Sequence, residues 1–227
     1  AAGMVGSNLI KTINQKNKII IAIDNLILGK KKYLKPYFKK KSFYFLKKDL
    51  SKLIVSKKID NILKKNTLSE VWLMAANSDI KKGVKDYNID LNNTYMTTIH
   101  TIEFLQKYFK KNTKIIFTSS SAIYGNVKSR ISEKTKIDYP QSNYGFMKLA
   151  SEVYLSNISK KLGVKTYIFR FPNVVGPNLT HGLLYDMRKK ILSKNKFLQV
   201  LGNGEQQKPY SHVSEIINCM VFFKNKK

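Results

Sequence analysis

A tyrosine and a lysine four residues apart, Tyr144 and Lys148, are the strongest candidates for chemistry in the sequence. This spacing places both side chains on one face of a helix. A tyrosine hydroxyl has an ordinary pKa of about 10, so it acts as a base near neutrality only with help from its surroundings. A neighbouring ammonium group favours the phenolate. The pair therefore predicts a general base, Tyr144, whose pKa is lowered by Lys148.

A cluster of hydroxyl groups precedes this pair in the segment KIIFTSSSAIYG, which contains Ser119, Ser120 and Ser121. The segment has the pattern of a buried strand that ends in a turn, and ligands bind at the carboxyl ends of strands in open α/β sheets. Each feature alone has a plain structural explanation, because a tyrosine and a lysine four apart are common on helices. The combination in this order predicts an active site.

Two glycines, Gly3 and Gly6, lie at the start of the chain in AAGMVGSNLI. Glycine allows the backbone to approach a pyrophosphate, and the N-terminus of a following helix supplies amide donors and a positive dipole. Asp24 follows about 20 residues later, where a carboxylate binds the ribose hydroxyls of a dinucleotide and repels a 2′-phosphate. These residues predict NAD rather than NADP. A plain turn at the glycines and a capping role for Asp24 are the alternatives.

Apolar β-rich segments alternate along the chain with longer amphipathic segments, which predicts a parallel α/β sheet. Because the expected strands are apolar throughout, we expect a doubly wound, Rossmann-like sheet with helices on both faces. The expected strands cover residues 18–24, 42–46, 70–76, 114–119 and 165–171, with a short one near 197–201. The expected helices lie near residues 5–16, 52–65, 86–110, 144–162 and 183–194.

The sequence changes character after Phe171, where a loop rich in proline, glycine and asparagine begins (FPNVVGPNLTHG). We therefore expect an NAD-binding region over residues 1–171 and part of a smaller substrate-binding region over residues 172–227, some of which returns to the Rossmann sheet. The chain opens on the glycine loop without the strand from which such a loop hangs. We expect a fragment that lacks its first strand and a C-terminal portion.

The composition excludes several classes of protein. Among 227 residues, 42 are basic and 14 acidic, for a net charge of +28. Only three of the basic residues are arginines, the type that specific phosphate and base recognition favours, and the lysines are dispersed, so we expect no nucleic-acid partner.

No apolar segment approaches the ~18 residues of a membrane helix. The single cysteine, Cys219, excludes an intramolecular disulfide and fits a reducing, cytoplasmic location. No His/Cys/Asp cluster has metal-ligand spacing, so we expect no metal.

Nearly the whole sequence resembles the NAD-dependent epimerase/dehydratase family of extended short-chain dehydrogenases/reductases. The resemblance rests on AAGMVGS, IDNL, KKDL, LMAANSD, LNNT, FTSSSAIYG, YGFMK, RFPNVVGP and LGNGEQQKPYSHV. It implies that Tyr144 is the catalytic base, that Lys148 is its partner and a ribose ligand, and that Ser120 orients the substrate.

The resemblance also implies two sets of binding residues. For the cofactor these are Gly3, Met4, Val5, Gly6, Asp24, Asn25, Asp49, Leu50, Ala75, Ala76, Asn77, Asn93, Ser119, Tyr144, Lys148 and Pro172. For the substrate these are Ser120, Ser121, Tyr144, Asn173 and Lys208. The chain departs from the family at Met96, where a glycine is usual, and at Lys208, where many members have arginine.

The residues after Ser120 bear on the reaction. Dehydratases of the family carry an Asp-Glu pair there, whereas this chain has Ser121 and Ala122. The resemblance therefore favours a UDP-sugar epimerase that interconverts UDP-glucose and UDP-galactose by transient oxidation at sugar carbon 4. UDP-glucuronate decarboxylation, 4-epimerisation of UDP-N-acetyl sugars and dehydration are the enzymatic alternatives. A lysine-rich nucleic-acid-binding protein and a catalytically silent NAD-binding protein are remote ones. The resemblance also implies a homodimer.

Overall fold

The computed structural model describes residues 1–14, 17–127, 129–193, 197–198, 203–205 and 207–226, apart from the side chains of residues 80 and 81. Its α-helices are α1 (Met4–Ile13), α2 (Lys57–Lys65), α3 (Ile80–Lys85), α4 (Tyr87–Asp90), α5 (Thr97–Leu105), α6 (Asn143–Leu162), α7 (Leu183–Leu192) and α8 (Val213–Phe223). Its strands are β1 (Ile20–Asp24), β2 (Phe43–Lys47), β3 (Glu70–Leu73), β4 (Lys114–Ser120), β5 (Lys165–Phe171), β6 (Asn173–Val175) and β7 (Tyr210–His212).

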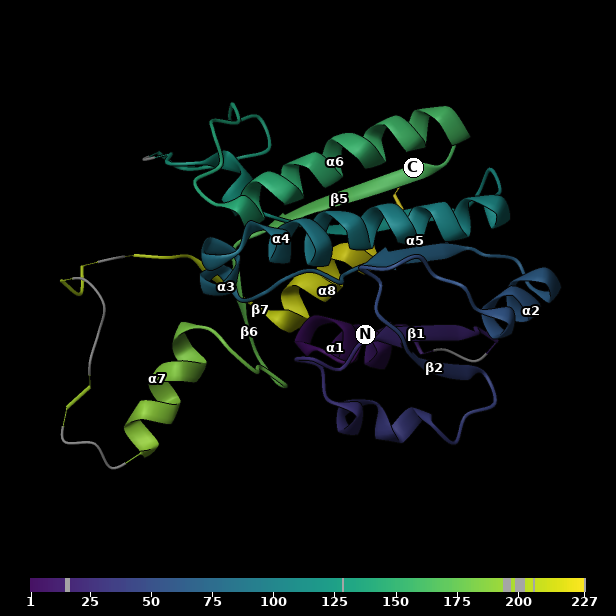
Figure 1. Ribbon diagram of the computed structural model, residues 1–227, viewed down its shortest axis with the longest axis horizontal. Coiled ribbons are helices and arrows are strands. Elements are labelled where there is room, and N and C mark those ends of the chain that lie inside the picture. Colours follow the sequence, from purple (N-terminus) through teal and green to yellow (C-terminus); the bar gives the residue numbers. More distant parts are fainter. Residues whose placement is uncertain (15–16, 128, 194–196, 199–202, 206, 227) are drawn as a thin grey trace.

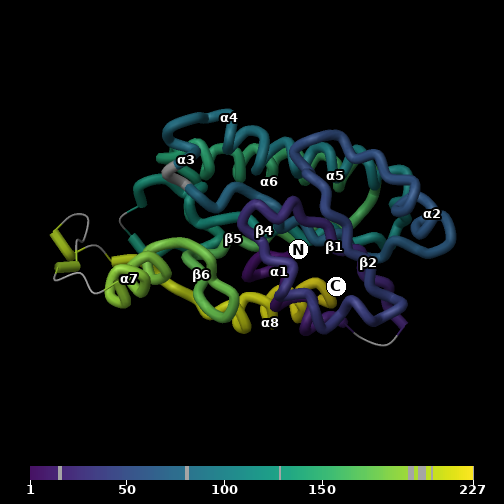
Figure 2. The backbone as a smooth tube through the Cα atoms, turned by 60° about the horizontal axis from the view of Figure 1, so that its bottom comes forward, coloured from purple at the N-terminus to yellow at the C-terminus, as the bar shows by residue number. Residues whose placement is uncertain are grey.

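All strand pairs among the described residues are parallel. β1 pairs with β2, β4 lies between β3 and β5, and β6 pairs with β7. Figure 2 shows α4, α5 and α6 on one side of the strands and α1 and α8 on the other. The predicted α/β fold with helices on both faces is confirmed.

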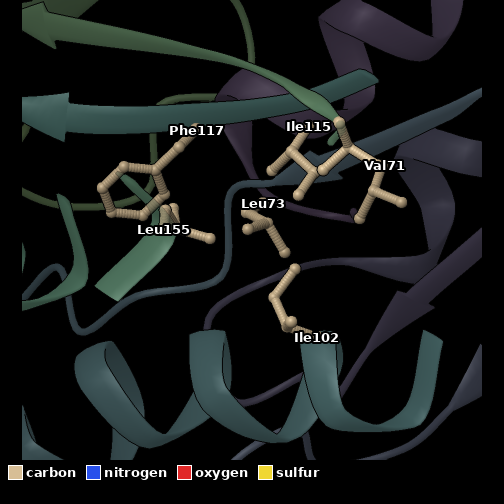
Figure 3. Close-up of a cluster of buried hydrophobic side chains, with 7 residues drawn as sticks. Val71, Leu73, Ile102, Ile115, Phe117 and Leu155 are labelled. Atoms are coloured by element: carbon tan, nitrogen blue, oxygen red, sulfur yellow. The ribbon is translucent and has the colours of Figure 1, made fainter. Parts of the chain in front are cut away.

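The side chains of β4 show how the sheet is covered. Ile115 and Phe117 pack with Ile102 of α5 and Leu155 of α6, in the cluster that Figure 3 shows. Ile116, between them in the sequence, packs in a second cluster with α1 and α8. Successive side chains of a strand point to opposite faces, so this alternation requires an apolar layer on each side. The uniformly apolar sequence of β4 follows from that requirement.

The region expected to be one helix over residues 86–110 is divided. The four-residue helix α4 leads into a π-helical segment, Leu91–Met96, which continues as α5 and ends in a 3₁₀ turn, Gln106–Tyr108. A π-helical turn changes the direction of the side chains around it, and such turns are frequent at functional sites. A periodic sequence pattern does not distinguish it from an α-helix.

Two other expectations differ from the structure. β3 ends at Leu73, three residues before the expected end of its strand at residue 76. The strand expected near residues 197–201 falls mostly outside the described residues, and the described residues 197 and 198 belong to no strand. The short strands β6 and β7 were not predicted, because their pairing joins Asn173 to Tyr210 across a long intervening segment.

Residues after β5 lie in two places. α7 stands apart from the sheet (Figure 1) and buries none of its residues. α8 packs on the face of the sheet that α1 covers, with Val213, Ile216, Ile217 and Met220 buried against Leu9. No helix in the described part of the chain is long and apolar enough to cross a membrane.

Candidate active site

The start of α6 positions Tyr144. Ser142 caps the helix, because its hydroxyl oxygen accepts a hydrogen bond from the Gly145 N–H at 3.1 Å. A Cβ at Gly145 would lie 2.6 Å from the carbonyl oxygen of Ala122, so only glycine allows this approach. The first turn of α6 therefore lies directly against the turn that follows β4, and Tyr144 faces the serines at the end of that strand.

The structure brings the three predicted catalytic residues together. The Tyr144 hydroxyl is hydrogen-bonded to Ser120. The Lys148 ammonium lies 5.7 Å from the centroid of the Tyr144 ring and donates a hydrogen bond to the carbonyl oxygen of Thr118 at 2.6 Å. Lys148 is almost completely buried, with 2% of its surface exposed. The i,i+4 spacing thus places both side chains at the carboxyl end of β4.

The electrostatics of this group are set mainly by burial. Burial is the main reason that the pKa of Tyr144 is raised to about 12; the hydrogen bond with Ser120 opposes the rise, and the negative charge of Asp90 adds to it. Burial also lowers the pKa of Lys148 to about 7, against the charge of Glu152. The net shift of the Tyr144 pKa is therefore upward, because burial is its largest cause, and the effect of Lys148 on this pKa stays a prediction. Desolvation outweighs the lysine, which itself carries only part of its charge at neutral pH.

A partly buried ion pair supports the same helix one turn further on. The Arg170 guanidinium of β5 binds the Glu152 carboxylate through Nε and Nη2, with the shortest contact at 2.7 Å. Arg170 Nη1 also donates to the Tyr124 hydroxyl at 2.9 Å. These bonds join α6 to β5 and to the 3₁₀ turn after β4. They hold the helix that carries Tyr144 and Lys148 in register with the sheet.

The glycine loop and Asp24 are in direct contact. One carboxylate oxygen of Asp24 accepts a hydrogen bond from the Ala2 N–H at 2.7 Å, and the other accepts one from the Leu26 N–H at 2.8 Å. A Cβ at Gly6 would lie 2.5 Å from the carbonyl oxygen of Ala1, whereas the space beside Gly3 is open. The hydrogen bond between Ala2 and Asp24 thus holds the glycine loop against the end of β1.

These features fit a dinucleotide. The open space beside Gly3 lies at the N-terminus of α1, where amide groups bind phosphate. At the end of β4, the Ser119 hydroxyl is buried and has no hydrogen-bond partner among the described residues. A buried hydroxyl without a partner is unfavourable, and a polar ligand at this edge of the sheet would satisfy it.

The other predicted cofactor residues lie in the loops that follow the strands. Met4 and Val5 are in the first turn of α1, Asn25 follows β1, Asp49 and Leu50 follow β2, Ala75, Ala76 and Asn77 follow β3, and Pro172 separates β5 from β6. Asn93 lies in the π-helical segment. Their positions at carboxyl ends of parallel strands are those of a ligand cleft.

Of the predicted substrate residues, Asn173 begins β6, which pairs with β7, and Lys208 lies two residues before β7. The Asn173 side chain donates a hydrogen bond to the carbonyl oxygen of Pro209 at 3.3 Å, and Lys208 is exposed. In the described part of the chain, no hydrogen bond or ion pair joins these two residues to Tyr144. The described residues also contain no group of three or more His, Cys, Asp or Glu side chains placed to hold a metal ion.

Sequence reasoning missed two residues beside this site, Asp90 and Gly83. Asp90 is buried and accepts a hydrogen bond from the Asn77 side chain, and Gly83 lies against the Asp90 carboxylate. Asp90 stands in a polar helical segment, and its sequence neighbours give no sign that it turns inward. Asp90 is the last residue of α4, and the π-helical segment begins at the next residue.

Solved structures with the same fold include several nucleotide-sugar enzymes. The model superimposes on UDP-glucose 4-epimerase of Thermotoga maritima, determined with UDP-glucose, with a TM-score of 0.84 and 25% identity over 100% of this chain and 72% of that chain. It superimposes on UDP-glucuronic acid 4-epimerase of Bacillus cereus, determined with UDP-glucuronic acid and NAD, with a TM-score of 0.86 and 24% identity over 100% of this chain and 72% of that one. The fold is Rossmann-like.

The family follows from the sequence comparison. The model of the NAD dependent epimerase/dehydratase family matches residues 1–227, and the chain belongs to that family. A putative UDP-glucose 4-epimerase of Methanocaldococcus jannaschii is 26% identical over 233 residues, which span 100% of this chain and 72% of the relative. The predicted family and NAD as cofactor are confirmed.

Proposed function

We propose that the protein is a nucleotide-sugar 4-epimerase that interconverts UDP-glucose and UDP-galactose. One observation carries the proposal: Ser120, Tyr144 and Lys148 meet at the end of β4, next to a turn whose Ser121 and Ala122 bring no carboxylate. Dehydration requires an additional acid and base to remove water, whereas 4-epimerisation requires one group that takes and returns one proton. The relatives' own substrates agree with this choice of nucleotide.

Each residue of the group has a defined task. Tyr144, as the phenolate, accepts the proton of the hydroxyl group at sugar carbon 4 and later returns it. Ser120 donates a hydrogen bond that holds the same oxygen in place. NAD⁺, if bound beside these residues, would supply a reversible hydride acceptor for carbon 4, so that no other redox partner would be consumed. The positive charges of Lys148 and of the oxidised cofactor favour the phenolate that burial disfavours.

We further propose that residues 1–171 hold the cofactor and that residues 172–227 contribute to the substrate side. The open space beside Gly3 and the unpartnered Ser119 hydroxyl support the first part. The contact between Asn173 and Pro209, next to Lys208, supports a shared contact with the substrate diphosphate.

A cytoplasmic homodimer completes the proposal. α5 and α6 run side by side (Figure 1) on the outer face of the molecule. Phe146 and Val153 of α6, seven residues apart and therefore on one side of the helix, are both 56% exposed. A second copy of this chain would cover that apolar stripe.

The test follows the anomeric protons by NMR while the protein is incubated with NAD⁺ and UDP-galactose. We expect UDP-glucose to appear, and Tyr144→Phe to abolish its formation. Tyr154→Phe is the matched control, because Tyr154 lies ten residues further along α6, outside the Ser120–Tyr144–Lys148 group, and it should leave the rate unchanged. Binding of NAD⁺ without conversion would refute the assigned substrate; a new product from UDP-glucuronate or UDP-N-acetylglucosamine would then name the reaction.

A further inference from the structure

Asp90 is a buried carboxylate that the proposed reaction does not use. Only 1% of its surface is exposed, and it stands at the junction of α4 and the π-helical segment. A buried carboxylate is unfavourable unless other groups compensate it. The groups that contact the Asp90 carboxylate therefore indicate which part of the structure it stabilises.

The first partner is Asn77, in the loop after β3. The Asn77 amide donates a hydrogen bond to the Asp90 carboxylate at 2.6 Å, and both side chains are buried. The same Asn77 accepts from the Asp79 N–H at 3.0 Å, and its own N–H donates to the Thr94 hydroxyl at 3.1 Å. Asp90 thus completes a set of bonds that fixes the loop after β3 against the π-helical segment.

The second contact leads to the catalytic helix. A Cβ at Gly83 would lie 1.9 Å from an oxygen of the Asp90 carboxylate, so the absence of a side chain at Gly83 makes room for it. The carbonyl oxygen of Gly83 accepts a hydrogen bond at 3.1 Å from the side chain of Asn143, the residue before Tyr144. The turn that houses Asp90 is therefore tied to the first turn of α6.

We propose that Asp90 is a positioning residue of the active site, which fixes the loop at Asn77 and sets the electrostatic surroundings of Tyr144 by its charge. The proposal rests on Tyr144 being the catalytic base. The charge of Asp90 raises the pKa of Tyr144, and the Lys148 ammonium, from the same helix as Tyr144, lies 5.7 Å from the centroid of the Tyr144 ring. Asp79 and Asp86 also lie in this region, where they cap α3 and α4.

The charge of Asp90 acts against proton loss from Tyr144, whose pKa it raises. Burial raises the pKa of Asp90 itself, and the hydrogen bond from Asn77 lowers it. The charge of Asp90 therefore opposes formation of the Tyr144 phenolate. Formation of the phenolate therefore depends on the groups that stabilise it, Lys148 and the oxidised cofactor.

The test measures the titration of Tyr144 directly. Tyrosine labelled with ¹³C at Cζ gives a resonance that Tyr144→Phe identifies, and its pH dependence is recorded in the protein and in Asp90→Asn. We expect the titration of Tyr144 to move to lower pH by about one unit in Asp90→Asn, because one like charge is removed. Asp86→Asn is the matched control, since it removes an exposed carboxylate four residues away, and it should leave the titration in place.

An unchanged titration of Tyr144 in a folded Asp90→Asn protein would overturn the proposal, because a merely structural role would lower stability without moving it. If Asp90→Asn does not fold, Asp90→Ser removes the same charge with less bulk beside Gly83 and is measured instead. In parallel, the rise of kcat/KM with pH, with UDP-galactose as probe, should shift in the same direction. Absence of turnover would refute the assigned reaction, while the NMR titration would still decide the role of Asp90.

Discussion

Replacing Lys148 by methionine tests whether the buried lysine of the active site lowers the stability of the folded protein. The ammonium group is buried, and its pKa is lowered from 10.5 to about 7. That shift corresponds to roughly 5 kcal/mol of unfavourable free energy for holding the charged form in the folded protein. Methionine has a similar length and no charge, but it leaves the carbonyl oxygen of Thr118 without the hydrogen bond that Lys148 donates, a loss of about 1–3 kcal/mol.

We therefore expect Lys148→Met to increase the free energy of unfolding by about 2–4 kcal/mol at pH 6. The gain depends on pH in a defined direction. Below pH 7 the lysine is charged in both the folded and the unfolded state, and the full penalty applies. Between about 7 and 10.5 the folded lysine is neutral while the unfolded one is charged, so the unfolded state binds more protons and the stability of the natural protein rises with pH. The advantage of methionine shrinks across this window.

Urea denaturation at a series of pH values measures the effect, with Lys160→Met as the control because Lys160 is exposed on the same helix. The control should change stability by less than about 0.5 kcal/mol. The reasoning is refuted if Lys148→Met is no more stable than the natural protein at pH 6, or if its advantage does not shrink toward pH 10.5. The variant should bind and convert substrate poorly, so that stability and activity change in opposite directions.

Two further predictions concern the glycine loop and the ion pair beneath α6. Gly6→Ala should lower the melting temperature, because the added Cβ would lie 2.5 Å from a backbone oxygen. Gly3→Ala has open space beside it and should leave the melting temperature unchanged. It should nevertheless weaken NAD binding at least tenfold, as measured by calorimetry. Equal effects of the two substitutions on melting would contradict this. Glu152→Ala should cost about 3–5 kcal/mol in urea denaturation, because it leaves the Arg170 guanidinium without its buried partner. A loss below 1 kcal/mol would show that water replaces the carboxylate.

The sequence predicted the parts of the molecule that depend on local pattern. The apolar segments that became β1, β2, β4 and β5 were found within a few residues of their ends, since a strand buried on both faces has a distinctive composition. The tyrosine and lysine of α6 were placed on one face by spacing alone. The family resemblance then connected them with Ser120, which the structure places in hydrogen-bond contact with Tyr144.

What the sequence missed depends on contacts between distant segments. The π-helical segment follows from how residues 91–96 pack between the loop after β3 and α6, and hydrophobic periodicity does not record such packing. The raised pKa of Tyr144 was missed for a related reason: spacing showed that Lys148 is near, but the amount of water removed from both groups is known only once the chain is folded.

The pairing of β6 with β7 has a consequence for how the protein can vary. These two strands hold Val175 and Tyr210 in one short ladder, so the segment between them begins and ends at fixed positions. The entropy of closing a flexible loop grows only with the logarithm of its length, and doubling the length costs about 0.6 kcal/mol. Insertions or deletions in this segment, which carries α7, therefore disturb the sheet very little. This part of the chain can be lengthened, shortened or replaced while β4 and α6 remain as they are.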